Sequence, residues 1–131
     1  MAKVLVIDDS ASTLDLMENI LTRVGHKVIV MDSGKRAQPF LANESFDLVI
    51  TDVYMPDMDG LEVLRTVRRI RPGLPVIAMS SLVGKYDMLA VAAALGAAKT
   101  LRKPFSVSQL LESVDACLPS SETADARAHD A

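Results

Sequence analysis

The chain has 131 residues, of which 50% are hydrophobic and 24% are charged, and its formal net charge is -3. This length suits a single domain with a substantial core, and the lack of a basic block argues against a general nucleic-acid binder. The single cysteine, Cys117, excludes an internal disulfide. No apolar stretch approaches the roughly 20 residues that span a bilayer, and the chain starts without a signal-peptide pattern. We therefore expect a cytoplasmic protein with no membrane insertion.

Five short apolar runs, each followed by polar or turn residues, predict five buried strands. In chain order they are Val4–Ile7, Val28–Met31, Leu48–Asp52, Pro75–Met79 and Ala98–Arg102. The fifth run is weaker than the others and leads into Lys103 and Pro104. Each run has the length of a strand and is shorter than a typical helix.

Helical patterns lie between these strands. The first helix is expected to begin at Ser12, because Asp15 three residues later resembles a capping box, and to end at Gly25. The alternation predicts a second helix over Lys35–Asn43. Pro39 lies inside it, removes a backbone hydrogen bond and favours a kink or a late start.

Three more helices are expected after the third, fourth and fifth strands. Asp59 is placed to cap the first of them, Lys85–Leu95 predicts an alanine-rich helix, and Ser106 with Gln109 predicts a capping box at the start of the last. The composition becomes polar and alanine-rich near the end. We therefore predict one domain over residues 1–118 and a disordered tail over 119–131.

Strands that alternate with helices in this way predict an α/β fold, with a parallel sheet covered by helices on both faces. Right-handed crossovers then bring the carboxyl ends of all strands to one edge, where open α/β sheets bind their ligands. The polar residues that follow the strands at this edge are Asp8, Asp9, Asp52, Ser80 and Lys103.

This set of side chains is suited to phosphoryl chemistry. Three close carboxylates repel one another, and Mg²⁺ prefers one or two carboxylates together with waters and phosphate oxygens. With the charge neutralised, Asp52 can attack phosphorus as a nucleophile, while Ser80 and Lys103 hold the oxygens of the transferred group. Taken singly, Asp8 and Asp9 are better explained as helix caps. Only the combination favours the functional interpretation.

Four motifs carry a resemblance to the receiver domain of two-component response regulators, over about residues 3–118. They are Val6–Ser10, Asp52–Gly60, Pro75–Ser81 and Lys103–Phe105. The resemblance implies a flavodoxin-like, doubly wound sheet of five strands in the order 2-1-3-4-5, which is the order of the chemotaxis regulator of this family.

The resemblance also implies roles for the acidic residues. Asp52 is similar to the aspartate that accepts the phosphoryl group. Asp8 and Asp9 resemble the acid pair that holds Mg²⁺, the expected cofactor. Tyr54 occupies the position whose backbone carbonyl completes the metal shell.

Ser80 matches the family's switch hydroxyl, and Lys103 matches the lysine that pairs with the phosphoryl group. Lys103–Pro104 resembles the family's cis peptide bond. One position departs from the pattern, because Thr100 stands three residues before the lysine, where relatives carry a signalling aromatic. Either the threonine hydroxyl replaces the ring, or the output runs mainly through the segment after Ser80.

Two bulky residues lie next to the proposed site, at positions where relatives carry small or polar side chains. They are Tyr54 and Leu82. Bulk at these positions is expected to hinder a hydrolytic water. We therefore hypothesise slow loss of the phosphoryl group from this chain.

The resemblance implies a signalling switch, not a conventional enzyme. A histidine kinase or histidine phosphotransfer protein would phosphorylate Asp52, and the surface of the fourth helix, fifth strand and fifth helix would change to control a partner protein. A monomer or weak dimer is expected. A phosphorelay intermediate and a receiver fragment of a larger regulator remain open alternatives.

Three other classes of protein fit less well. A phosphohydrolase with an aspartate nucleophile would want a second acid where this chain has Tyr54. A flavin or nucleotide binder would want a phosphate loop after the first strand, where Asp8 and Asp9 repel a metal-free phosphate. A receiver-like module that has lost phosphorylation is disfavoured by the intact cluster.

Overall fold

The structure, a computed structural model that describes residues 1–55, 60–81 and 87–118, contains a five-stranded parallel sheet in the order β2-β1-β3-β4-β5. The strands are β1 (Lys3–Ile7), β2 (Lys27–Met31), β3 (Leu48–Asp52), β4 (Val76–Ser81) and β5 (Lys99–Lys103). The helices are α1 (Ala11–Arg23), α2 (Gly34–Asn43), α3 (Gly60–Ile70), α4 (Met88–Ala94) and α5 (Val107–Cys117). The predicted fold class and strand order are confirmed.

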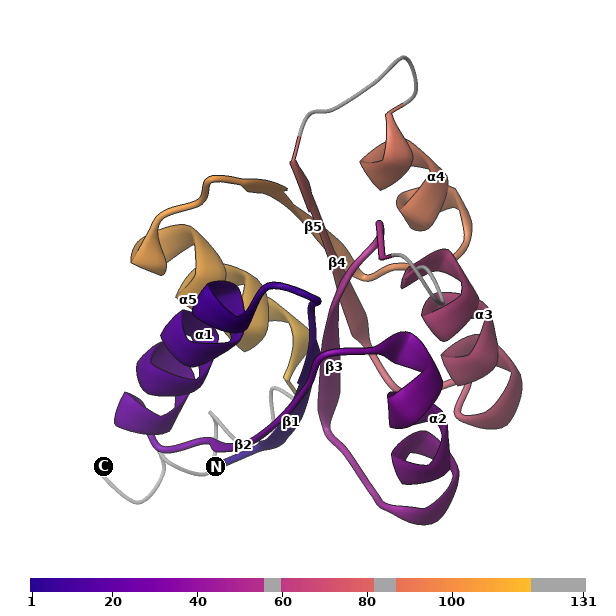
Figure 1. Cartoon of the computed structure of the whole chain (residues 1–131), viewed down its shortest axis with the longest axis horizontal. Coiled ribbons are helices and arrows are strands. Elements are labelled where there is room, and N and C mark those ends of the chain that lie inside the picture. Colours follow the sequence, from indigo (N-terminus) through magenta and orange to yellow (C-terminus); the bar gives the residue numbers. More distant parts are fainter. Residues whose placement is uncertain (56–59, 82–86, 119–131) are drawn as a thin grey trace, which may run out of the picture.

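The helices cover both faces of the sheet, α1 and α5 on one side and α2, α3 and α4 on the other (Figure 1). Successive strand residues point to opposite faces, so each strand contributes to two cores. On β1, Leu5 packs toward α2, α3 and α4, whereas Val6 packs toward α1 and α5. We call these the α2–α4 core and the α1/α5 core. All of β3 is buried, because it lies between β1 and β4 and is covered on both faces.

Two helix starts differ from the sequence-based expectation. The first helix is capped by Ser10, not Ser12, because the Ser10 hydroxyl accepts a hydrogen bond from the Thr13 amide at 3.3 Å. The second helix begins at Gly34 with Ser33 as its cap and continues through Pro39. The late start considered for this helix is therefore wrong. The capping box of Ser106 and Gln109 on α5 is confirmed.

The fourth and fifth strands reach further than predicted. β4 continues past Met79 to Ser81, and β5 continues to Lys103, because the ladder between them persists through the pairs Ser80–Arg102 and Ser81–Lys103. Ser80 and Lys103 are therefore strand residues rather than loop residues. α4 starts at Met88, later than expected, because the Asp87 side chain caps it.

Some predictions concern residues outside the described ranges. They are the cap at Asp59, the effect of Leu82, the helical character of Lys85 and the tail over 119–131. Within the described ranges, no helix combines the length and the apolar character that a membrane crossing needs.

Candidate functional site

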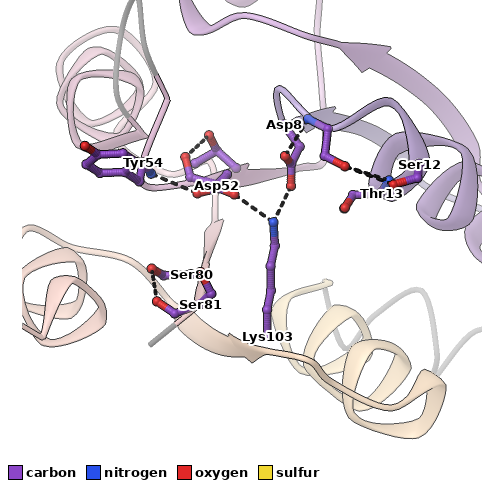
Figure 2. Close-up of polar contacts among 10 residues, drawn as sticks. Asp8, Ser12, Thr13, Asp52, Tyr54, Ser80, Ser81 and Lys103 are labelled. Atoms are coloured by element: carbon purple, nitrogen blue, oxygen red, sulfur yellow. Dashed lines mark hydrogen bonds and ion pairs between the residues drawn. The ribbon is translucent and has the colours of Figure 1, made fainter. Parts of the chain in front are cut away.

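Four of the predicted site residues meet at the carboxyl edge of the sheet. Asp8 follows β1, Asp52 ends β3 and Lys103 ends β5, so the three side chains enter the same space from strands that are distant in sequence (Figure 2). Lys103 Nζ lies 2.6 Å from Asp8 Oδ2 and 2.7 Å from Asp52 Oδ2. Asp9 completes the group, since its carboxylate, with those of Asp8 and Asp52, provides oxygens that all lie within 4.8 Å of one another.

The acidic cluster of Asp8, Asp9 and Asp52 has the chemistry of a site for a hard divalent cation. Asp8 and Asp52 are buried, whereas Asp9 is exposed to solvent. Buried carboxylates at this separation repel one another, and oxygen ligands are the kind that Mg²⁺ and Ca²⁺ prefer. The residues present therefore fit a bound cation, and the exposed Asp9 keeps one of the three carboxylates in contact with solvent.

Asp8 is held by groups on three sides. Its backbone amide donates to the Met31 carbonyl at 3.1 Å, and its Oδ1 accepts from the Ser10 amide at 3.0 Å. The Lys103 ammonium group donates a hydrogen bond to the other carboxylate oxygen, Oδ2. The start of α1 and the end of β2 thus fix where this carboxylate points.

Asp52 is oriented in a similar way. Its Oδ1 accepts from the Tyr54 amide at 2.8 Å, while its Oδ2 is paired with Lys103 (Figure 2). The Tyr54 side chain is 77% exposed, so the tyrosine contributes to the orientation of Asp52 through its backbone. The carboxylate is therefore presented at the edge of the sheet in a defined direction.

Burial sets the protonation of this site. It raises the pKa of the Asp52 carboxyl above its ordinary value of 3.8, although hydrogen bonds from Lys103 and the Tyr54 amide oppose the rise. Burial alone would lower the pKa of Lys103, but hydrogen bonds to Asp52 and Asp8 and their charges raise it above 10.5. One ammonium group thus compensates incompletely for the buried carboxylates, which again favours an added cation.

The two predicted hydroxyl residues are not part of this hydrogen-bonded group. Ser80 is buried on β4, and its hydroxyl donates to the Ser81 carbonyl at 3.0 Å, as Figure 2 shows. Thr100 is exposed on β5. The Lys103–Pro104 peptide bond is cis, as the resemblance implied.

Sequence reasoning overlooked two residues that support the site, Ser10 and Thr51. The Ser10 hydroxyl caps α1, and the Ser10 amide donates a hydrogen bond to Asp8 Oδ1. Thr51 is fully buried before Asp52, and its hydroxyl donates to the Asp52 carbonyl at 3.0 Å. A hydroxyl inside an otherwise apolar strand was the available signal for Thr51.

A family model described as "Response regulator receiver domain" matches residues 4–115. Among curated proteins, the response regulator protein FleR of Pseudomonas aeruginosa is 41% identical over 113 residues, which cover 86% of this chain and 24% of FleR. Sporulation initiation phosphotransferase F of Bacillus subtilis is 30% identical over 117 residues, which cover 89% of this chain and 94% of that protein. The chain thus spans about a quarter of the length of FleR and nearly all of phosphotransferase F.

Solved structures agree. A response regulator receiver domain protein from Clostridium thermocellum superimposes with a TM-score of 0.85 at 29% identity, covering 95% of this chain and 99% of that one. The chemotaxis protein CheY4 of Vibrio cholerae gives a TM-score of 0.81 at 31% identity, covering 90% and 99%.

Proposed function

The chain belongs to the family of response regulator receiver domains, and we propose that its Asp52 accepts a phosphoryl group from a histidine kinase or a histidine phosphotransfer protein. The observation that carries this proposal is the placement of Asp52, buried at the end of the central strand with Lys103 at 2.7 Å and two further carboxylates close by. A structural aspartate would not need this surrounding of charge.

The proposed transfer needs no general base on this chain. The bond between phosphorus and the donor's histidine nitrogen breaks, and a bond between phosphorus and an Asp52 oxygen forms. The carboxylate has no proton to lose, and the departing imidazole takes a proton from solvent. Lys103, whose raised pKa keeps it charged, would hold the oxygens of the phosphoryl group, and the Ser80 hydroxyl would turn from Ser81 toward them.

Mg²⁺ is the proposed cofactor, held by Asp8, Asp9, Asp52 and the Tyr54 backbone carbonyl. When bound, it would offset the negative charge of the carboxylates and of the incoming phosphoryl group. The all-oxygen ligand set and the incomplete compensation by Lys103 support this assignment. The resemblance to receiver domains supplies the choice of Mg²⁺ over Ca²⁺.

The proposed output is a change in the surface of α4, β5 and α5 that controls a partner protein, so the domain acts as a signalling switch. Because Thr100 replaces the usual aromatic residue, the response would depend on β4, β5 and α4 themselves. A phosphorelay intermediate is the second candidate, and its support is the likeness to phosphotransferase F over 94% of that protein. The similarity to FleR covers 24% of the length of FleR, and this supports the alternative that the chain is the receiver part of a larger regulator.

Intact-mass measurement tests the proposal. We expect acetyl phosphate and Mg²⁺ to add one phosphoryl group, with acetate as the leaving group. The adduct should be absent with a chelator and in Asp52→Asn. A phosphoryl adduct that persists in Asp52→Asn would contradict the assignment of the acceptor. No adduct in the wild-type chain, and none after incubation with phosphorylated kinases or phosphotransfer proteins, would contradict the proposed function.

The lifetime of the phosphoryl group is a further expectation. Tyr54 places a large exposed side chain two residues after Asp52. We expect Tyr54→Asn to lose the phosphoryl group severalfold faster than the wild type, because a small polar residue lets water approach, and Leu82→Glu should act in the same direction. The decay of phosphorylated protein by mass spectrometry measures this. Unchanged decay in both variants would show that the bulk of these two side chains does not control the lifetime of the phosphoryl group.

A further inference from the structure

The two peptide groups that follow the Asp52 side chain are held at both ends. In the Asp52–Val53 peptide, the carbonyl accepts from the Thr51 hydroxyl at 3.0 Å and the Val53 amide donates to the Met79 carbonyl at 2.9 Å. In the Val53–Tyr54 peptide, the carbonyl accepts from the Gly60 amide at 3.2 Å and the Tyr54 amide donates to Asp52 Oδ1 at 2.8 Å. Every polar backbone group here has a partner, as buried backbone requires.

Two of these four hydrogen bonds join backbone groups, and a third uses the Asp52 carboxylate itself. The Thr51 hydroxyl is the one remaining side-chain partner. Thr51 is fully buried, and its neighbours across the sheet are Ile7 on β1 and Ala78 on β4. Neither neighbouring side chain can accept a hydrogen bond. The Asp52 carbonyl therefore satisfies the Thr51 hydroxyl, and in return the hydroxyl fixes the plane of that peptide.

Gly60 confines the same peptide from the side of α3. A Cβ atom at residue 60 would overlap the Asp52 carbonyl oxygen and lie 2.6 Å from Val53 Cα. The start of α3 thus approaches the backbone after Asp52 more closely than any side chain permits. The Asp52 carbonyl is held between the Thr51 hydroxyl and the Gly60 backbone, and it has little freedom to rotate.

We propose that Thr51 is a positioning residue for the phosphoacceptor: its hydroxyl fixes the Asp52–Val53 peptide, and through it the Tyr54 amide that orients the Asp52 carboxylate. Loss of the hydroxyl would leave this peptide with the Met79 hydrogen bond and the Gly60 contact alone, and this loosening would weaken the bond between the Tyr54 amide and Asp52 Oδ1. This inference rests on the proposed function, because it concerns the orientation of the proposed acceptor.

A set of hydroxyl-only substitutions tests this inference. Thr51→Val removes the hydroxyl at nearly constant volume, Thr51→Ser keeps it, and Thr51→Ala differs from Thr51→Ser by the hydroxyl alone. Thr66→Val is the matched control, since Thr66 is a buried threonine on α3 outside the site. The measurements are the initial rate of adduct formation with acetyl phosphate, the dissociation constant for Mg²⁺ by calorimetry, and the melting temperature.

We expect Thr51→Val to form the adduct about three- to tenfold more slowly, the loss typical of one neutral hydrogen bond. Its Mg²⁺ dissociation constant should rise severalfold. Thr51→Ser should restore both values, and Thr66→Val should change neither. Equal rates and equal Mg²⁺ affinities for Thr51→Val and wild type, with both folded, would overturn the inference. If Thr51→Val does not fold, the comparison of serine with alanine decides in the same way.

The two proposals fail differently. If the wild-type chain accepts no phosphoryl group, the proposed function fails, and the Mg²⁺ affinities of the four variants still show whether Thr51 orients the site. If the wild type is phosphorylated and the Thr51 series shows no dependence on the hydroxyl, only the positioning role fails.

Discussion

At the scale of single residues, Lys103 determines how the site behaves without a cation. Its ammonium group bridges Asp8 and Asp52 at 2.6 and 2.7 Å and is largely shielded from solvent. It therefore neutralises part of the negative charge that a divalent cation would otherwise neutralise. The lysine would compete with the proposed cation for the carboxylates, although it would assist the phosphoryl group once that group arrives.

This competition predicts opposite effects of one substitution. Lys103→Met should bind Mg²⁺ about tenfold more tightly, roughly 1.4 kcal/mol, because a positive charge is removed from the carboxylates. It should also form the phosphoryl adduct more slowly. Calorimetric titration with Mg²⁺ and intact mass measure the two effects. Lys35→Met, at an exposed position on α2, is the control for net charge; weaker Mg²⁺ binding by Lys103→Met would contradict the argument.

The raised pKa of Asp52 predicts how stability depends on pH. The folded state favours the protonated carboxyl, so this contribution to stability is present below pH 3.8 and is lost as the pH rises through the higher folded-state pKa. Asp52→Asn removes the buried charge. In the presence of a chelator, it should therefore melt above the wild type at pH 7, with the difference shrinking toward pH 3.8. Thermal melts across this range check it; a variant less stable at pH 7 would contradict it.

At the scale of elements, one ion pair links the fifth strand to the fourth helix. Arg102 on β5 pairs in register with Ser80 on β4, and its guanidinium lies 3.4 Å from Asp87 Oδ1. The same Asp87 oxygen accepts from the amides of Leu89 and Ala90 at the start of α4. The pair therefore connects the strand ladder beside Ser80 to the cap of α4.

Loss of this ion pair should loosen the start of α4. We expect Arg102→Gln and Asp87→Asn each to speed hydrogen exchange of the Leu89 and Ala90 amides by about two- to fivefold, because exposed ion pairs are weak and asparagine still caps a helix. The double variant should add little. Arg36→Gln, which breaks the exposed pair with Asp32 on α2, should leave these amides unchanged. Exchange equal to wild type in both single variants would exclude a role for the pair.

At the scale of the whole molecule, the two cores meet in the same strands. Leu64 on α3 is buried in the α2–α4 core, and Leu21 on α1 is buried in the α1/α5 core. Because β1, β3 and β4 contribute alternate residues to both cores, neither layer of helices can detach without exposing the apolar face of the sheet. The described part of the chain should therefore unfold as one cooperative unit.

Substitutions in the two cores test this cooperativity. Leu64→Ala and Leu21→Ala should each lower the free energy of unfolding by about 2–5 kcal/mol, since each leaves a cavity in a fully packed core. The double variant should be additive within about 0.5 kcal/mol, because the sheet separates the two sites. Urea unfolding followed by circular dichroism and by NMR gives these values. Two separate transitions would show that the layers unfold independently.

The sequence by itself determined the architecture and the acidic cluster. Apolar runs such as Leu48–Asp52 and the helical patterns between them are local features, and parallel strands with right-handed crossovers necessarily align their carboxyl ends. Asp8, Asp9, Asp52 and Lys103 could therefore be assigned to one edge before any coordinates were known. Their proximity follows from topology alone, and the structure agrees with it.

Only the tertiary structure decided the hydrogen-bond partners of these residues. Ser10 rather than Ser12 caps α1, the Ser80 hydroxyl turns to Ser81, and Thr51 holds the Asp52 carbonyl. Such choices depend on differences of about 1 kcal/mol between alternative donors and acceptors and on contacts between distant elements, such as Gly60 against Asp52. Periodicity and motif spacing carry no information at that resolution, because they place a residue on an element without fixing what its side chain touches.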